Sequence, residues 1–188
     1  MARRIASAAL AVALLALPIL AHAGYGRDLR RVTKTGRVYH MHTWDAELIW
    51  NATFFSDKFV KSFEKKHEKI KHLIGEEAAR FEAEQMDRQL NGWDFFVGIY
   101  TKDRYTKFSH YEDTFWRIEL TTGSGQVVKP MLVEKIPVTP YEERMFPYLD
   151  RWSNGYRVTF PKVPLGDEIK LTIKSVVGSS TLEWNVNK

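Results

Sequence analysis

From Trp93 onward, apolar side chains repeatedly recur at every second position over short runs, and this alternation restricts the fold more than any other feature of the sequence. It is clearest in five short runs: 97–99, 116–120, 156–160, 171–173 and 182–186. A period of two places apolar side chains on one face of a strand and polar side chains on the other. Glycine-containing turns at 123–125, 154–155, 165–167 and 178–180 separate the runs. The pattern predicts an antiparallel β-sandwich of about seven or eight strands.

Residues 56–90 have a helical period instead. Ser56 is placed to cap a helix, and Phe59 and Phe63 begin an apolar stripe whose opposite faces are filled by lysine and glutamate. Gly75 is expected to bend or break this helical segment. Because residues 47–55 read as a first long strand, we expect a helical insertion after the first strand of a mainly β fold.

The first 23 residues are typical of a signal peptide. Arg3 and Arg4 begin the segment, residues 8–17 are uninterruptedly apolar, and residues 21–23 form a small-x-small cleavage site. The apolar run is shorter than the roughly 20 residues of a membrane-spanning helix, which favours cleavage over a retained anchor. We therefore expect cleavage between Ala23 and Gly24 and a periplasmic or extracellular mature protein that does not span the membrane.

The remaining chain divides into two parts. Residues 24–36 are rich in arginine and lysine, and we expect a solvated basic arm that is mobile or lies at a sheet edge. Residues 37–188 contain no linker-like stretch or internal repeat, so we expect a single β-sandwich domain with its helical insertion at 56–90.

The composition excludes several classes of function. The chain has no cysteine, which removes disulfides, thiolate metal sites and cysteine nucleophiles. Without residues 1–23 the net charge is +3, too small an imbalance to indicate nucleic acid as a partner. The fold must therefore be held by its own core, for which the chain's 13% of aromatic residues offer enough apolar area.

Part of the chain resembles a known kind of protein. The segments 116–120, 127–130 and 156–161, together with a strand followed by a charged helix, look like a loosely defined group of small exported bacterial proteins of uncharacterised function. The resemblance covers about residues 45–186 and implies an immunoglobulin-like sandwich. Its motifs are packing and turn signals, so it implies no catalytic residue.

The segment 129–152 is the most unusual stretch outside the strands, because four prolines alternate with large apolar side chains. Prolines mark sheet edges, and rigid aromatic side chains provide contact area for a partner. One interpretation is an exposed ridge that binds a protein, with the contact residues Tyr141, Met145, Phe146, Tyr148 and Trp152. The other is an edge whose aromatic side chains cover the core.

Metal binding and catalysis have weaker signals. His40 and His42 are two apart, so on a strand both imidazoles point to one side and provide two of the ligands of a metal site. No nucleophile elbow, phosphate loop or paired-carboxylate motif is present, so the sequence assigns no catalytic residue, and it implies no cofactor.

The sequence thus leaves three hypotheses open. The first is a non-enzymatic cell-envelope protein that acts through contacts with an envelope protein. The second is a carbohydrate-binding module for envelope or extracellular polysaccharide, and the third is a histidine-based metal-binding protein.

Overall fold

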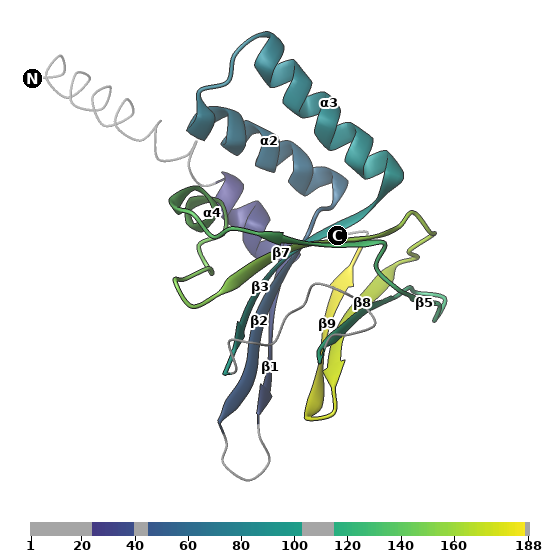
Figure 1. Ribbon diagram of the computed structural model, residues 1–188. Helices are drawn as coiled ribbons and strands as arrows, with labels where there is room; N and C mark the ends of the chain where they lie inside the picture. Colours follow the sequence, from purple (N-terminus) through teal and green to yellow (C-terminus); the bar gives the residue numbers. More distant parts are fainter. Residues whose placement is uncertain (1–23, 40–44, 103–114, 187–188) are drawn as a thin grey trace, which may run out of the picture.

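The computed structural model describes residues 24–39, 45–102 and 115–186. Within them the protein is mainly β, with two antiparallel sheets and a pair of long helices on one side (Figure 1). The predicted signal peptide at 1–23 lies outside the described residues. No helix in the described ranges combines the length and apolar character needed to cross a bilayer.

The larger sheet has five strands in the order β1-β2-β3-β7-β6. Their bounds are β1 Thr33–Tyr39, β2 Ala46–Phe54, β3 Gly92–Thr101, β6 Leu132–Ile136 and β7 Asn154–Pro161. The predicted strand at 47–55 is β2, and its central position explains why four of its side chains are fully or almost fully buried: Leu48, Trp50, Ala52 and Phe54.

The smaller sheet has four strands in the order β5-β4-β8-β9. Their bounds are β4 Arg117–Thr121, β5 Val127–Val128, β8 Glu168–Ser175 and β9 Gly178–Asn185. The alternating runs of the sequence place their apolar members toward the other sheet, as predicted: Ile118, Leu120, Leu171, Ile173, Leu182 and Trp184 are all buried.

The two sheets share one hydrophobic cluster. It joins inward-facing residues of β2, β3 and β7 to those of β4, β8 and β9, with Trp50, Trp116 and Trp184 as its largest members. The β1 and β9 edges meet beside this cluster, where the Trp50 indole donates a hydrogen bond to Ser180 Oγ at 3.0 Å. Gly36 permits the approach, because a Cβ there would lie 2.3 Å from Trp50 Nε1.

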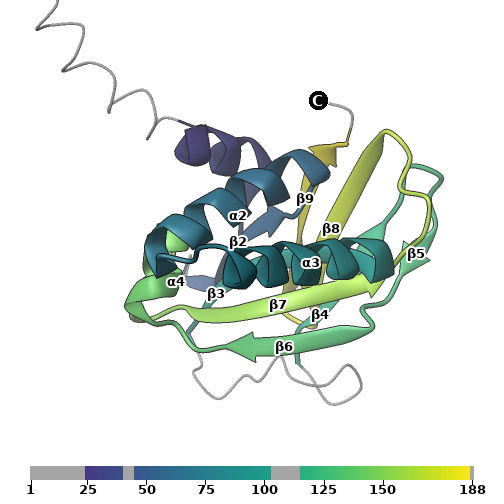
Figure 2. The ribbon, with the colours of Figure 1, turned by 90° about the horizontal axis from the view of Figure 1, so that it is seen from above.

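Helices α2 (Asp57–Lys71) and α3 (Glu76–Asn91) lie side by side over the outer face of the larger sheet (Figure 2). Ser56 caps α2 as predicted, and Gly75, with a φ of 59°, separates the two helices. The helical insertion is thus confirmed as two helices. It follows the second strand and not the first, because β1 precedes β2.

A second hydrophobic cluster joins the helices to the outer face of the sheet. It contains Phe55, Phe59, Phe63 and Phe96, and it extends to residues 145–149 after the short helix α4 (Pro140–Met145). Strand β3 serves both clusters, since Phe95 belongs to the inner one and Phe96 to the outer one.

The segment 24–36 is not a mobile, solvated arm; of the two expected alternatives, the position at a sheet edge is found for residues 33–36. Residues 24–32 form a helix, and β1 begins at Thr33 as an edge strand of the larger sheet. Tyr25, Leu29 and Val32 are spaced by four and three, and they pack against the second cluster, while the arginines point outward. This short apolar stripe indicates a helix, but the many arginines of the segment favoured its interpretation as a solvated arm.

Candidate functional site

Of the five predicted partner-binding residues, two are core residues. Met145 is 0% exposed and Phe146 is 3% exposed, and Phe146 stacks on Phe96 with ring centroids 3.9 Å apart. The prediction of an exposed ridge is therefore wrong at these two positions. Helix α4 turns them inward, because a capping box at Thr139 starts the helix against the sheet and its apolar end must be covered.

Tyr141 and Tyr148 are half-buried, and their hydroxyl groups are used within the fold. Tyr148 shares a hydrogen bond with Thr53 Oγ1 at 2.8 Å, and Tyr141 with the His67 ring. Burial raises the pKa of Tyr141 to about 12, and it raises the pKa of Tyr148 even further. Both hydroxyls therefore stay protonated at neutral pH and help to position the α4 segment.

Trp152 differs from the other four. Its side chain is 49% exposed, and the Arg151 guanidinium lies 4.8 Å from its ring centroid. The segment that carries it is held by Asp150, whose carboxylate accepts hydrogen bonds from the backbone N–H groups of Trp152 and Ser153, each at 2.9 Å. This turn fixes the backbone at Trp152.

Trp152 lies at a groove on the outer face of the larger sheet, which we call the β2–β3 groove. The groove has a volume of about 550 Å³ and is lined by Asp45, Ala46, Ile49, Asn51, Gly98, Tyr100, Lys102, Tyr148, Asp150, Trp152 and Ser153. In the sheet, Ile49 pairs with Tyr100 and Asn51 pairs with Gly98, so these four residues form neighbouring positions of the floor.

One wall of the groove is formed by residues 148–153, and Gly98 determines how closely this wall approaches the sheet that forms the floor. A Cβ at this position would lie 2.6 Å from Leu149 Cδ2 and 3.1 Å from Tyr148 Cε2. Only glycine therefore lets residues 148–149 rest directly on β3. The consequence is a wall that continues to Asp150 and Trp152 and stands beside the exposed part of the sheet.

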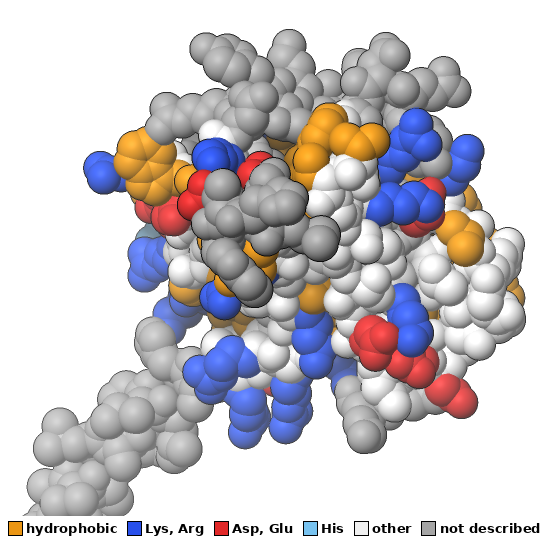
Figure 3. Space-filling model, turned by 90° about the horizontal axis from the view of Figure 1, so that it is seen from below, with side chains coloured by type: hydrophobic (Ala, Val, Ile, Leu, Met, Phe, Trp, Pro, Cys, Tyr) orange, Lys and Arg blue, Asp and Glu red, His pale blue; other side chains and the backbone are white. Residues whose placement is uncertain are grey.

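The groove combines aromatic and hydrogen-bonding side chains. Tyr100 is 37% exposed, and Asn51 accepts a hydrogen bond from Thr35 Oγ1 at 2.6 Å. At one end Lys102 Nζ lies 2.8 Å from Asp45 Oδ2. Figure 3 shows that basic, acidic and hydrophobic side chains all reach the surface at the end of the molecule away from the helices.

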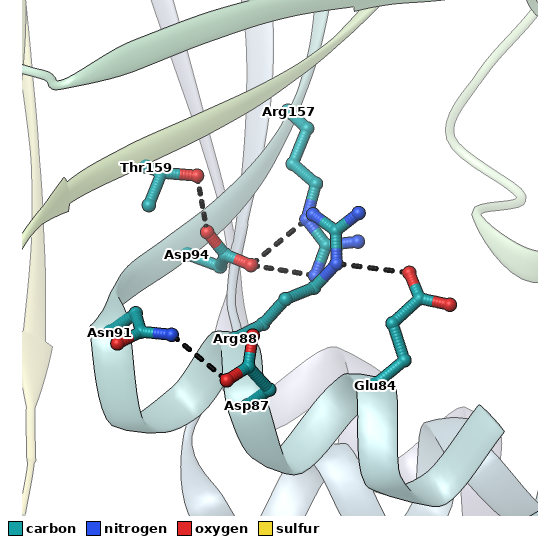
Figure 4. A network of polar contacts seen from close by, with 7 residues as sticks. All are labelled: Glu84, Asp87, Arg88, Asn91, Asp94, Arg157 and Thr159. Atoms are coloured by element: carbon teal, nitrogen blue, oxygen red, sulfur yellow. Dashed lines mark hydrogen bonds and ion pairs between the residues drawn. The ribbon is translucent and has the colours of Figure 1, made fainter. Parts of the chain in front are cut away.

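A second polar group lies on the same sheet face, beneath α3 (Figure 4). Asp94 is 6% exposed, and Arg157 donates to its Oδ2 from Nε at 2.9 Å and from Nη2 at 2.6 Å. Thr159 donates to the other carboxylate oxygen. The adjoining cavity has a volume of only about 10 Å³, hardly enough for one water molecule, so we interpret this group as structural.

The predicted metal ligands His40 and His42 lie outside the described residues, so the metal site stays a prediction. In the described ranges, no three His, Asp or Glu side chains form a group that would hold a metal ion.

Searches of protein-family models, of curated proteins and of solved structures found no match to this chain. The geometry of the groove is therefore the basis on which a function can be assigned. Sequence reasoning found Trp152 but missed Tyr100, Asn51 and Asp150. The alternation in β2 and β3 carried the signal for the first two, because their apolar neighbours point to the core.

Proposed function

We propose that this protein is an exported carbohydrate-binding module that holds a saccharide chain in the β2–β3 groove. The observation that carries the proposal is the pair of exposed aromatic rings, Tyr100 and Trp152, on one groove with Asn51 and Asp150. The C–H faces of a sugar ring are apolar and pack on aromatic rings, while its hydroxyl groups bond to carboxylates and amides.

The shape of the groove favours a chain over a single enclosed sugar. Its volume of about 550 Å³ is within the range of ligand sites, and it is open along the sheet surface. Preformed walls reduce the entropy lost on binding, and here Gly98 and the Asp150 turn hold the wall in place.

The test is a calorimetric titration of the mature, exported protein with a panel of soluble polysaccharides and peptidoglycan fragments. We expect Tyr100→Ala and Trp152→Ala each to weaken binding about tenfold, the loss expected for removing one stacked ring worth somewhat more than 1 kcal/mol. Unchanged affinity in both variants, or no binding across the panel, would contradict the proposal.

A second candidate function is contact with an envelope protein through the free edge of β6. Within the described residues β6 pairs only with β7, and Met131 and Leu132 beside this edge are 55% and 49% exposed. An extended segment of a partner can add to such an edge by backbone hydrogen bonds.

Leu132→Ala separates the two candidates. It truncates a side chain as exposed as Trp152, on the edge strand β6, which β7 separates from the strands of the groove. Sugar binding should not change in Leu132→Ala, whereas capture of a protein at the β6 edge should weaken. The reverse result would favour the protein-binding hypothesis.

Both candidates assume export, which follows from the predicted signal peptide, and they place the site on a β-sandwich. Two antiparallel sheets around one core are compatible with the predicted immunoglobulin-like sandwich. Detection of a mature N-terminus at Gly24 by mass spectrometry would support export. An intact Met1 in the protein recovered from its host would contradict it.

A further inference from the structure

The end of α2 and the turn at 72–75 form a second open surface, which shares no lining residue with the β2–β3 groove. This surface is a concave region of about 730 Å³ with the four cationic side chains Lys65, Lys66, Lys69 and Arg144 and the single carboxylate Glu68. Arg144 comes from α4, so two elements contribute to the same positive surface. The turn is visible at the upper left of Figure 1, above α4.

These cations are not neutralised within the described part of the fold. None of the ion pairs found there involves Lys65, Lys66, Lys69 or Arg144. Burial lowers the pKa of Lys66, and Arg144 and Lys69 lower it further because like charges crowd its ammonium group. An anion at this surface would relieve that repulsion.

An exposed apolar tip stands beside the cations. Ile74 is 81% exposed, and Leu73 before it is half-buried. Left-handed backbone at His72 and a φ of 59° at Gly75 enclose these two residues, and the Leu73 N–H bonds to the Glu68 carbonyl at 3.0 Å. The backbone of the turn thus holds the two apolar side chains at the end of the helix.

A single exposed isoleucine is common, and so is a basic helix face. Their combination on one surface matches the chemistry of an anionic lipid bilayer. Lipid phosphates attract lysine and arginine, and the boundary between headgroups and acyl chains accepts apolar side chains. An anionic polysaccharide would use the lysines but would gain nothing from Leu73 and Ile74.

We propose that this surface docks the protein on an anionic lipid bilayer, with Leu73 and Ile74 entering the headgroup boundary and Lys65, Lys66, Lys69 and Arg144 contacting lipid phosphates. The docking is peripheral and reversible, since two side chains and four charges provide far less binding energy than a spanning helix. It would hold the protein at a membrane surface, independently of what the β2–β3 groove binds.

The test is sedimentation of the mature protein, recovered after export without residues 1–23, with vesicles of phosphatidylcholine alone or with one quarter phosphatidylglycerol. We expect binding only to the anionic vesicles, and weaker binding as salt is raised. Lys65→Gln/Lys69→Gln should reduce the affinity about 25-fold, since each basic residue near the surface contributes roughly fivefold. Ile74→Ser should reduce it about tenfold through lost apolar burial.

The matched control is Lys58→Gln/Lys61→Gln, which removes the same charge from exposed positions of the same helix outside this surface. It should bind vesicles nearly as well as the unchanged protein. Equal losses in the two double variants would show a general charge effect and overturn the proposal. So would an unchanged affinity of Ile74→Ser, or absence of binding to anionic vesicles by a correctly folded protein.

Discussion

The outer face of the larger sheet has a covered half and an open half, and they use the same strands differently. In the covered half, Asp94 and Phe96 of β3 lie beneath the helices and residues 145–149. In the open half, Gly98 and Tyr100 of the same strand line the β2–β3 groove. All four point to one side, because they are two residues apart along the strand.

Strand alternation determines on which side of the sheet a side chain lies, but not what covers that side. Where the helices exclude water, Asp94 requires Arg157 and Thr159 as partners, because an unpaired buried carboxylate is costly. Where no helix covers the sheet, Lys102 and Asp45 form an ion pair in solvent. The covered half therefore contributes stability, and we expect the open half to contribute binding.

Two residues of one segment, Phe146 and Trp152, should differ most in their contribution to stability. Phe146→Ala should lower the free energy of unfolding by about 4 kcal/mol, because it empties a buried, stacked position against Phe96. Trp152→Ala should change it by no more than about 0.5 kcal/mol, as is usual for an exposed site. Urea denaturation measures both, and similar losses in the two variants would break the distinction between the halves.

The second prediction concerns the two ion pairs. Asp94→Ala should lower the free energy of unfolding by about 3 kcal/mol, because Arg157, whose side chain is only 15% exposed, loses its carboxylate partner. Lys102→Ala removes one member of the exposed pair with Asp45, and we expect no measurable shift of the denaturation midpoint. If Asp94→Ala unfolds at the same urea concentration as the unchanged protein, the buried network is not structural.

The third prediction lies at the boundary between the halves. Gly98→Ala should lower the free energy of unfolding by about 2 kcal/mol, because its new Cβ would overlap Leu149 and Tyr148 and push the wall away from the sheet. Saccharide affinity should fall with it, because the wall carries Trp152. Calorimetry on the folded variant checks this, and full affinity would show that the wall position does not matter.

The sequence could predict the strands and helices better than the tertiary contacts between them. The runs at 116–120, 156–160 and 171–173 have polar side chains opposite apolar ones, and all became strands with the apolar members buried. The helical insertion was also predictable, because Ser56 and the phenylalanines after it provide a cap and an apolar stripe. These signals depend on residues close together in sequence, so they determine secondary structure.

The candidate site was less predictable, because it depends on contacts distant in sequence. Phe146 and Trp152 are both large and aromatic in a proline-rich segment, and nothing local tells which of them meets Phe96 across about 50 residues of chain. Tyr100 looks like any polar-face residue until the helices are seen to leave it uncovered. The small stripe of Tyr25 and Leu29 was hidden by arginines for a similar reason.

The stability of the covered half should also depend, more weakly, on pH. The His67 ring stacks on Phe81 at 3.8 Å and bonds to the Tyr141 hydroxyl. Burial lowers the pKa of His67 below its usual 6.5, Lys71 lowers it further, and Glu84 opposes this. The unfolded chain then binds the proton more readily, so stability is fully present above about pH 6.5 and declines as pH falls toward the folded-state pKa.

His67→Phe keeps an aromatic ring against Phe81 but cannot titrate, so it should flatten the decline in unfolding free energy between about pH 7 and pH 5. The comparison uses differences in slope, since loss of the Tyr141 hydrogen bond lowers the stability of His67→Phe at every pH. An equal slope in the unchanged protein and in His67→Phe would show that protonation of His67 does not oppose folding of the covered half.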